Sequence, residues 1–71
     1  MNRAPAGLYR VRVLEPGLER SSEYDFESLE RAKAFANDAA SETEFGPVFS
    51  SIYNDQGEEI YRGRHYGMEE S

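Results

Sequence analysis

The sequence contains no cysteine, which excludes disulfide bonds, thiolate zinc sites and cysteine nucleophiles. It contains one histidine, His65, which excludes a metal site built from several histidines and leaves a single side chain that titrates near neutral pH. No apolar run has the length of a membrane-spanning helix or a signal-peptide core, so we expect a cytoplasmic protein with no membrane contact. These absences remove several classes of function before any residue pattern is considered.

Length and composition indicate one small folded domain, comprising residues 1–71. Apolar residues make up 38% and charged residues 31%, a ratio typical of a folded domain rather than a disordered tail. The five tyrosines and four phenylalanines exceed what so small a core holds, so we expect some aromatic side chains to be exposed. A core of this size seldom supplies more than about 3–5 kcal/mol of folding stability, and association with a partner often adds to that stability.

Alternation of apolar and polar residues predicts two strands near the beginning of the chain. Residues 1–7 are small and polar, and we expect them to fray, as we do residues 68–71. From residue 8 to residue 13, Tyr9, Val11 and Val13 alternate with two arginines. A turn at residues 15–17 leads to a second alternating stretch, residues 18–26, for which an irregular loop is the competing interpretation.

Residues 28–40 carry the clearest helical pattern. Apolar side chains recur there at three- and four-residue steps, which forms one stripe along a helix: Leu29, Ala32, Phe35, Ala36 and Ala39. Ser28 is a favourable N-cap residue, and Glu30 lies in the first turn, where the helix dipole favours negative charge.

Two further strands follow the helix. Residues 48–53 are β-branched and aromatic, and residues 54–57 have the composition of a hairpin loop, with Gly57 suited to a positive φ. The last strand starts at residue 58 or 59 and ends near residue 64, with Gly63 as a bulge inside it. The order β-β-α-β-β predicts a two-layer α+β fold, in which one helix packs on a small, mostly antiparallel sheet of four strands. The other face of that sheet is then open to water or to a partner.

Strand alternation predicts a surface rich in arginine on the open sheet face. If Val11 and Val13 face the helix, the neighbouring arginines point away from it. In the last strand, either Ile60 or Tyr61 faces the core, and this choice decides which way the flanking arginines point. The candidate interaction surface comprises Arg10, Arg12, Arg62, Arg64, Tyr66, Phe49 and Tyr53. Guanidinium groups there suit a phosphate, a carboxylate or an acidic protein surface.

A simpler interpretation of the same arginines is that they pair within the sheet. Glu19, Glu23 and Asp25 lie on the exposed side of the adjacent strand, within cross-strand reach of Arg10 and Arg12. Exposed ion pairs of this kind are common and individually weak.

An acidic segment supports a different class of function. Residues 15–30 contain six acids against Arg20 alone, and these form an alternative acidic surface: Glu15, Glu19, Glu23, Asp25, Glu27 and Glu30. Small phage-type inhibitors with acidic surfaces imitate nucleic acid and occupy the cleft of a DNA- or RNA-binding protein. That function requires the carboxylates to line one continuous surface. Direct binding to nucleic acid is disfavoured, because the chain carries a formal charge of −6.

The sequence offers little for catalysis or metal binding. His65 lies near the end of the last predicted strand, and no spacing supplies it with a catalytic partner. Residues 54–59 are rich in oxygen ligands but lack the alternation over twelve residues and the flanking helices of an EF-hand. We therefore expect no catalytic residue, no metal and no cofactor. The sequence favours a non-enzymatic module that binds another protein, or a second copy of itself as a homodimer, through the open sheet face or a strand edge.

Overall fold

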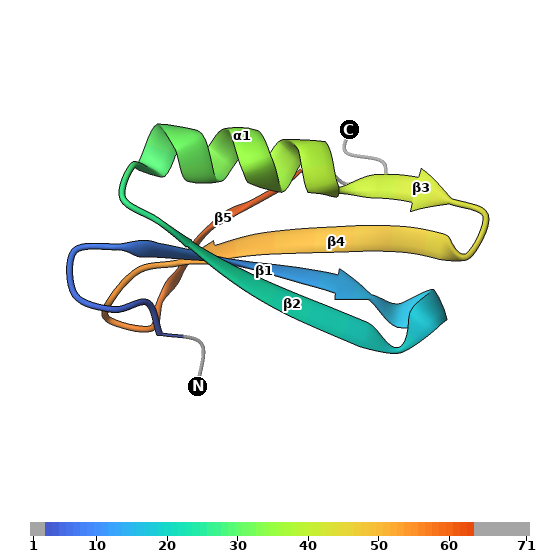
Figure 1. Ribbon diagram of the computed structural model, residues 1–71, viewed down its shortest axis with the longest axis horizontal. Coiled ribbons are helices and arrows are strands. Elements are labelled where there is room, and N and C mark those ends of the chain that lie inside the picture. Colours follow the sequence, from blue (N-terminus) through green and yellow to red (C-terminus); the bar gives the residue numbers. More distant parts are fainter. Residues whose placement is uncertain (1–2, 64–71) are drawn as a thin grey trace.

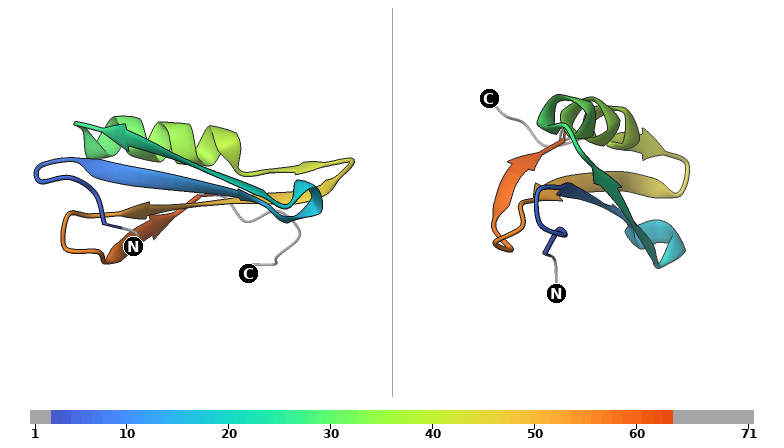
Figure 2. Two further views of the ribbon diagram at one scale, coloured as in Figure 1. Left: turned by 60° about the horizontal axis from the view of Figure 1, so that its bottom comes forward. Right: turned by 60° about the vertical axis from the view of Figure 1, so that its left-hand side comes forward.

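In the computed structural model, which describes residues 3–63, one helix lies across one face of a curved antiparallel sheet (Figures 1 and 2). The elements are β1 (Tyr9–Glu15), the 3₁₀ turn η1 (Pro16–Leu18), β2 (Arg20–Phe26), α1 (Leu29–Ala39), β3 (Ser41–Thr43), β4 (Gly46–Tyr53) and β5 (Glu59–Arg62). The strand order is β2-β1-β4-β3, and β5 also pairs with β4. This confirms the predicted α+β fold and its β-β-α-β-β order.

The sheet contains one strand that the sequence pattern does not predict. Strand β3 is three residues long and polar, so it carries no hydrophobic alternation. It pairs with the first part of β4, from Gly46 to Val48, whereas β5 pairs with the later part, from Ser51 to Tyr53. Strands β3 and β5 therefore follow one another along the same edge of β4 (Figure 1).

The core lies between α1 and the sheet, and the predicted apolar stripe of the helix forms one side of it. The buried cluster comprises Val11 and Val13 from β1, Val48 and Ile52 from β4, and Ala32 and Ala36 from α1. The alanines allow the helix to approach the sheet closely. Ser28 caps the helix as predicted, because its hydroxyl accepts a hydrogen bond of 3.3 Å from the Arg31 backbone N–H.

Residues 20–26 of the predicted stretch form a regular strand, β2, rather than a loop, and they contribute aromatic packing to the helix side. The rings of Tyr24 and Phe26 lie 4.8 and 5.2 Å, between centroids, from the ring of Phe35 on α1. Leu18, which the alternation places on the same face, lies instead in η1 and is 42% exposed. The strand begins only at Arg20 because η1 and the left-handed conformation of Glu19 reverse the chain before it.

Tyr61, and not Ile60, faces the helix from β5. The Tyr61 hydroxyl accepts a hydrogen bond of 2.9 Å from the Asn37 side chain, and Lys33 Nζ lies 5.0 Å from the centre of the tyrosine ring. Ile60 is 41% exposed, and the pairing of β5 with β4 shifts between Ile52 and Tyr53. Of the two candidates for the core-facing residue of the last strand, the structure therefore selects Tyr61.

Gly63 is not a bulge inside the last strand, because β5 ends at Arg62. Gly63 is buried, and its N–H donates a hydrogen bond of 3.0 Å to the Ser50 carbonyl oxygen. A Cβ at this position would overlap Ser50 Oγ and would lie 2.6 Å from the Ala36 carbonyl oxygen. Glycine is required here by the close approach of the chain to both β4 and α1.

The N-terminal segment is held in place from Ala4 onward, whereas its composition predicts fraying. Ala4 is buried and its N–H donates to the Asn54 carbonyl oxygen at 3.1 Å. The Gly7 N–H donates to Asp55 Oδ2 at 3.1 Å. The segment therefore packs on the hairpin loop of residues 54–57, in which Gly57 has the expected positive φ of 83°. Residues 68–71 lie outside the described residues.

Candidate interaction surface

The face of the sheet opposite α1 is defined by the strand register. Val11, Val13 and Ile52 are buried against the helix, so the residues that alternate with them project from the other side. Cross-strand partners share a face, and together they define the open face: Arg10, Arg12, Leu14, Ser21, Glu23, Asp25, Glu42, Pro47, Phe49, Ser51, Tyr53, Glu59 and Arg62.

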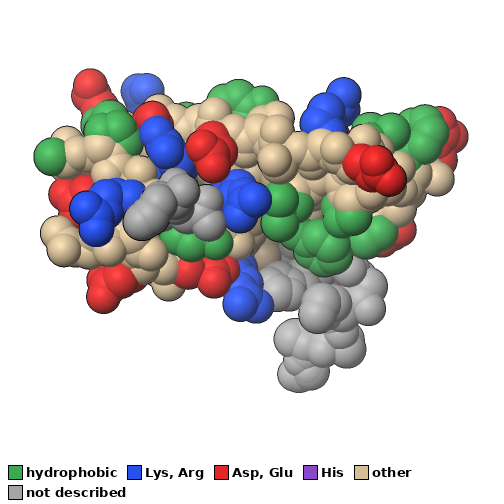
Figure 3. All heavy atoms as spheres, turned by 90° about the horizontal axis from the view of Figure 1, so that it is seen from below, with side chains coloured by type: hydrophobic (Ala, Val, Ile, Leu, Met, Phe, Trp, Pro, Cys, Tyr) green, Lys and Arg blue, Asp and Glu red, His purple; other side chains and the backbone are tan. Residues whose placement is uncertain are grey.

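Within the described part of the chain, only the N-terminal segment at one end adjoins the open face, and no helix or strand covers it (Figure 2). Figure 3 shows this side of the molecule. Hydrophobic side chains gather from the middle of the face toward η1 and the β3–β4 turn, and most Lys and Arg side chains lie over the other half. Leu14 and Phe49 are half-buried cross-strand partners on β1 and β4. This pair forms the apolar centre of the open face.

The structure brings together five of the seven residues predicted as an interaction surface. Arg10, Arg12, Phe49, Tyr53 and Arg62 all lie on the open face. The other two, Arg64 and Tyr66, lie outside the described residues, as does His65. The placement of the five described residues agrees with the strand alternation, and the role of all seven in binding stays a prediction.

Arg10 is paired within the sheet. Its Nε and Nη2 donate to the two carboxylate oxygens of Asp25 at 2.8 and 3.1 Å, and its Nη1 lies 3.6 Å from Glu23 Oε1. The hydrogen bond from Arg10 holds the pKa of Asp25 below its usual value. The simpler interpretation of the arginines therefore holds at Arg10, whose charge is already matched by two carboxylates.

Arg62 is paired but remains accessible. Its Nε donates to Glu59 Oε2 at 2.7 Å, and this hydrogen bond lowers the pKa of Glu59. The Arg62 side chain is still 63% exposed. Unlike Arg10, it retains donors that a second molecule can reach.

Arg12 lies between these two pairs, opposite Ser51 on β4 and Glu23 on β2. It forms no ion pair with any residue in the 3–63 range. Its Nε is buried and has no hydrogen-bond partner there. Of the three described arginines on the open face, Arg12 is therefore the one that has no ion pair within residues 3–63. Its Nε is unusual as well, because buried donors without a partner are rare in folded proteins.

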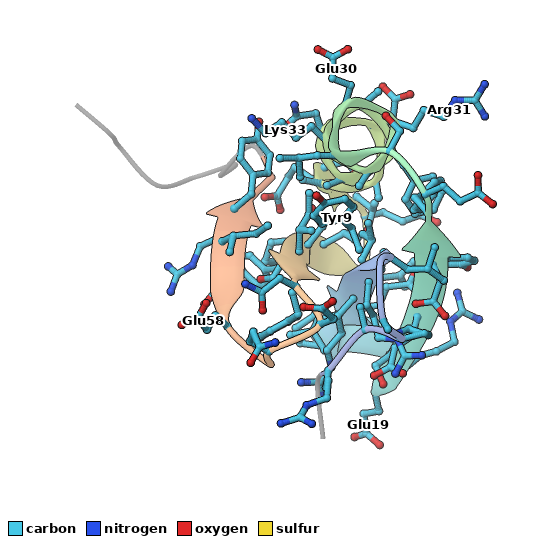
Figure 4. The ribbon with its side chains drawn as sticks, turned by 90° about the vertical axis from the view of Figure 1, so that its left-hand side faces the viewer. Tyr9, Glu19, Glu30, Arg31, Lys33 and Glu58 are labelled. Carbon is cyan, nitrogen blue, oxygen red and sulfur yellow. The ribbon has the colours of Figure 1, made fainter. Side chains whose placement is uncertain are left out.

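The six acids of the alternative acidic surface do not form one row. Glu15 pairs with Arg20 at 2.7 Å on the helix side of the sheet, and this bond lowers the pKa of Glu15, while Glu23 and Asp25 pair with Arg10. Glu19 and Glu30 project from opposite sides of the molecule (Figure 4). Glu27 follows the end of β2 and is exposed. The carboxylates are divided between faces, and three of them are matched by arginine.

An open groove of about 490 Å³ lies beside α1, on the helix side of the sheet. Tyr24, Phe35 and Val48 line it, and its one carboxylate, Glu15, is paired with Arg20. Within residues 3–63, no group of histidine and acidic side chains has the arrangement of a metal site. No helix in the same range is long and apolar enough to cross a membrane.

Leu14 and Glu42 are among the residues of the open face that the sequence analysis does not identify. Leu14 continues the alternation of Arg10 and Arg12, and following that pattern one step further would have found it. Glu42 lies on β3, a strand without a hydrophobic signal, and only its pairing with Pro47 places it on this face.

No protein-family model matches the chain, and no curated protein or solved structure matches it either.

Proposed function

We propose that this chain is a non-enzymatic protein-interaction module that binds through its open face. The observation that carries the proposal is the Leu14–Phe49 pair, an apolar centre on a sheet face that no described helix or strand covers. Arg12, whose Nε has no hydrogen-bond partner among residues 3–63, lies directly beside this pair. Aromatic side chains and arginine are the residues most enriched at the centres of protein interfaces.

The proposal includes no catalytic residue, metal or cofactor, no direct binding to nucleic acid, and a cytoplasmic location. Its partner is another protein or a second copy of the chain. The acidic mimic of nucleic acid receives less support, because three of its six carboxylates are paired with arginine, and Glu19 and Glu30 project from opposite sides of the molecule. The experiment below separates the two functions.

The test compares two apolar positions at the surface, the half-buried Phe49 and the exposed Ile60. Tagged native chain, Phe49→Ser and Ile60→Ser are used to capture partners from lysate of the native source, and the complexes are weighed by light scattering. Ile60 is the matched control, because it is exposed but lies beside Leu8, Tyr9 and Leu29 at the end of the molecule. We expect the native chain and Ile60→Ser to retain a stoichiometric partner and Phe49→Ser to lose it.

Equal capture by Phe49→Ser and the native chain would contradict the proposal, provided that circular dichroism shows both to be folded. A partner that depends instead on Glu30, tested with Glu30→Gln, would favour the acidic mimic. Glu30 projects from the outer side of α1, away from the sheet, so the two sets of variants report on different surfaces.

A further inference from the structure

Opposite charges are placed symmetrically about Phe49 on the open face. Glu42 on β3 pairs with Pro47, two residues before Phe49, and Arg62 on β5 pairs with Ser51, two residues after it. Both neighbours lie along the same edge of β4 (Figure 1). Two residues of a strand span about 6.8 Å, so Glu42 and Arg62 lie at similar distances on either side of Phe49.

The charges on the open face make this face self-complementary under a two-fold rotation. A two-fold axis that runs across the strands through Phe49 turns a second copy face to face with the first and reverses the direction of its strands. Phe49 and Leu14 of one copy then meet the same residues of the other. Glu42 of each copy lies opposite Arg62 of its partner, and symmetry repeats the contact. Facing sheets pack about 10 Å apart, a gap that these long side chains span.

The same rotation gives Arg12 an acidic neighbour. Arg12 precedes Leu14 by two residues, so the rotation places it opposite the partner's η1, which begins two residues beyond Leu14. Glu19 follows η1 directly, and its side chain extends away from the helix layer (Figure 4). Neither Arg12 nor Glu19 forms an ion pair within residues 3–63.

The overall charge also favours contact through this face. The open face carries three arginines and four carboxylates, a formal charge of −1, whereas the whole chain carries −6. Two copies of an acidic protein repel one another least where the facing surfaces are nearly neutral. The contact with a second copy therefore buries the Leu14–Phe49 pair at a small electrostatic cost.

We propose that the partner of the open face is a second copy of this chain, docked about a two-fold axis through Phe49 with Glu42 and Arg62 paired across the interface. This inference rests on the proposed function and names its partner. The first measurement is the mass of the native chain by sedimentation velocity from micromolar to millimolar concentration, where we expect a reversible dimer.

Charge exchange tests the geometry of the contact. Glu42→Arg places two positive side chains opposite each other at both symmetric positions, and we expect it to raise the dimer dissociation constant about tenfold or more. Arg62→Glu is expected to act similarly with two negative charges. The double variant restores the pairing with its polarity reversed, so its dissociation constant should return to within about threefold of the native value.

Two further variants control for a general effect of the added charge and for poor folding of Arg62→Glu. Glu30→Arg makes the same charge change on the outer side of α1 (Figure 4), and it should leave the dissociation constant within about twofold of native. Phe49→Lys places two like charges on the axis and should give a monomer, even if Arg62→Glu is poorly folded because of its neighbour Glu59. Circular dichroism confirms folding in each case.

A native chain that stays monomeric at millimolar concentration would overturn the inference. A dimer that tolerates both Glu42→Arg and Phe49→Lys would overturn it too, because the contact would then lie elsewhere. If the chain is monomeric but Phe49→Ser still abolishes capture of another protein, the proposed function stands with a different partner. If neither dimer formation nor capture depends on Phe49, both proposals fail.

Discussion

The hydroxyl of Ser50 on β4 donates a hydrogen bond of 2.6 Å to the carbonyl oxygen of Ala36 on α1. Ser50 is only 4% exposed, and its own carbonyl oxygen accepts the N–H of Gly63 at 3.0 Å. One buried serine therefore joins the helix, the central strand and the residue that follows β5. These contacts tie the second half of α1 to β4.

Replacing Ser50 with alanine should lower the free energy of unfolding by roughly 0.5–1.5 kcal/mol. The loss stays modest because the Ala36 carbonyl oxygen still accepts the Ala40 N–H at 3.0 Å, so no buried acceptor is left without a partner. Urea denaturation followed by circular dichroism measures the change. Unaltered stability would mean that the hydrogen bond from the Ser50 hydroxyl to α1 makes no net contribution to the free energy of unfolding.

Gly63→Ala should lower the free energy of unfolding by roughly 1–3 kcal/mol, because the new methyl group overlaps Ser50 Oγ and approaches the Ala36 carbonyl oxygen. The combined Ser50→Ala, Gly63→Ala variant should lose less than the sum of the two single changes, since removing Oγ relieves one of the two clashes. The same denaturation experiment, run on all three variants, checks this. Strict additivity would show that the two positions do not share the contact.

Ser28→Ala should cost about 1 kcal/mol of stability, because the helix loses the side chain that accepts the Arg31 N–H. Ser28→Asp is the matched control: it keeps an acceptor oxygen at the N-cap and adds negative charge, which the helix dipole favours there. Thermal unfolding should show a lower midpoint for the alanine variant and a midpoint near native for the aspartate variant. Equal midpoints for all three chains would contradict a capping role.

The protein should become less stable in acid, because protonation of Asp25 removes its ion pair with Arg10. The hydrogen bond from Arg10 holds the folded-state pKa of Asp25 below its usual value of 3.8. Its contribution to stability is therefore present above that value and is lost as the pH falls through the lower folded-state pKa. Denaturation at a series of pH values should show stability declining below about pH 4.

Asp25→Asn tests the origin of this decline. It should reduce stability at neutral pH slightly and make the acid branch of the curve shallower, since the titrating carboxylate is gone. Glu30→Gln removes a carboxylate that has no arginine partner in the described part and serves as the control. An acid branch unchanged in Asp25→Asn would assign the decline to other carboxylates.

The order and type of most elements followed from the sequence alone, because local patterns encode them. The apolar stripe of residues 29–39 and the cap at Ser28 specify a helix, and the alternation around Val11 and Val13 specifies a half-buried strand. The same alternation placed Arg10 and Arg12 on the face opposite the helix without knowledge of any partner strand. Each of these inferences needed only residues that are close together in the chain.

Only the tertiary structure decided how the strands are aligned. A slip of one residue turns every side chain of a strand to the other face, so local composition does not distinguish Ile60 from Tyr61 as the core residue. Likewise, nothing near Glu42 indicates that it lies on the same face as Arg62, because that relation depends on where two separate strands meet β4. Gly63 looked like a local irregularity, and its true constraint comes from Ser50 and Ala36, which are remote in sequence. These features depend on register between distant segments, which is set when the whole core packs.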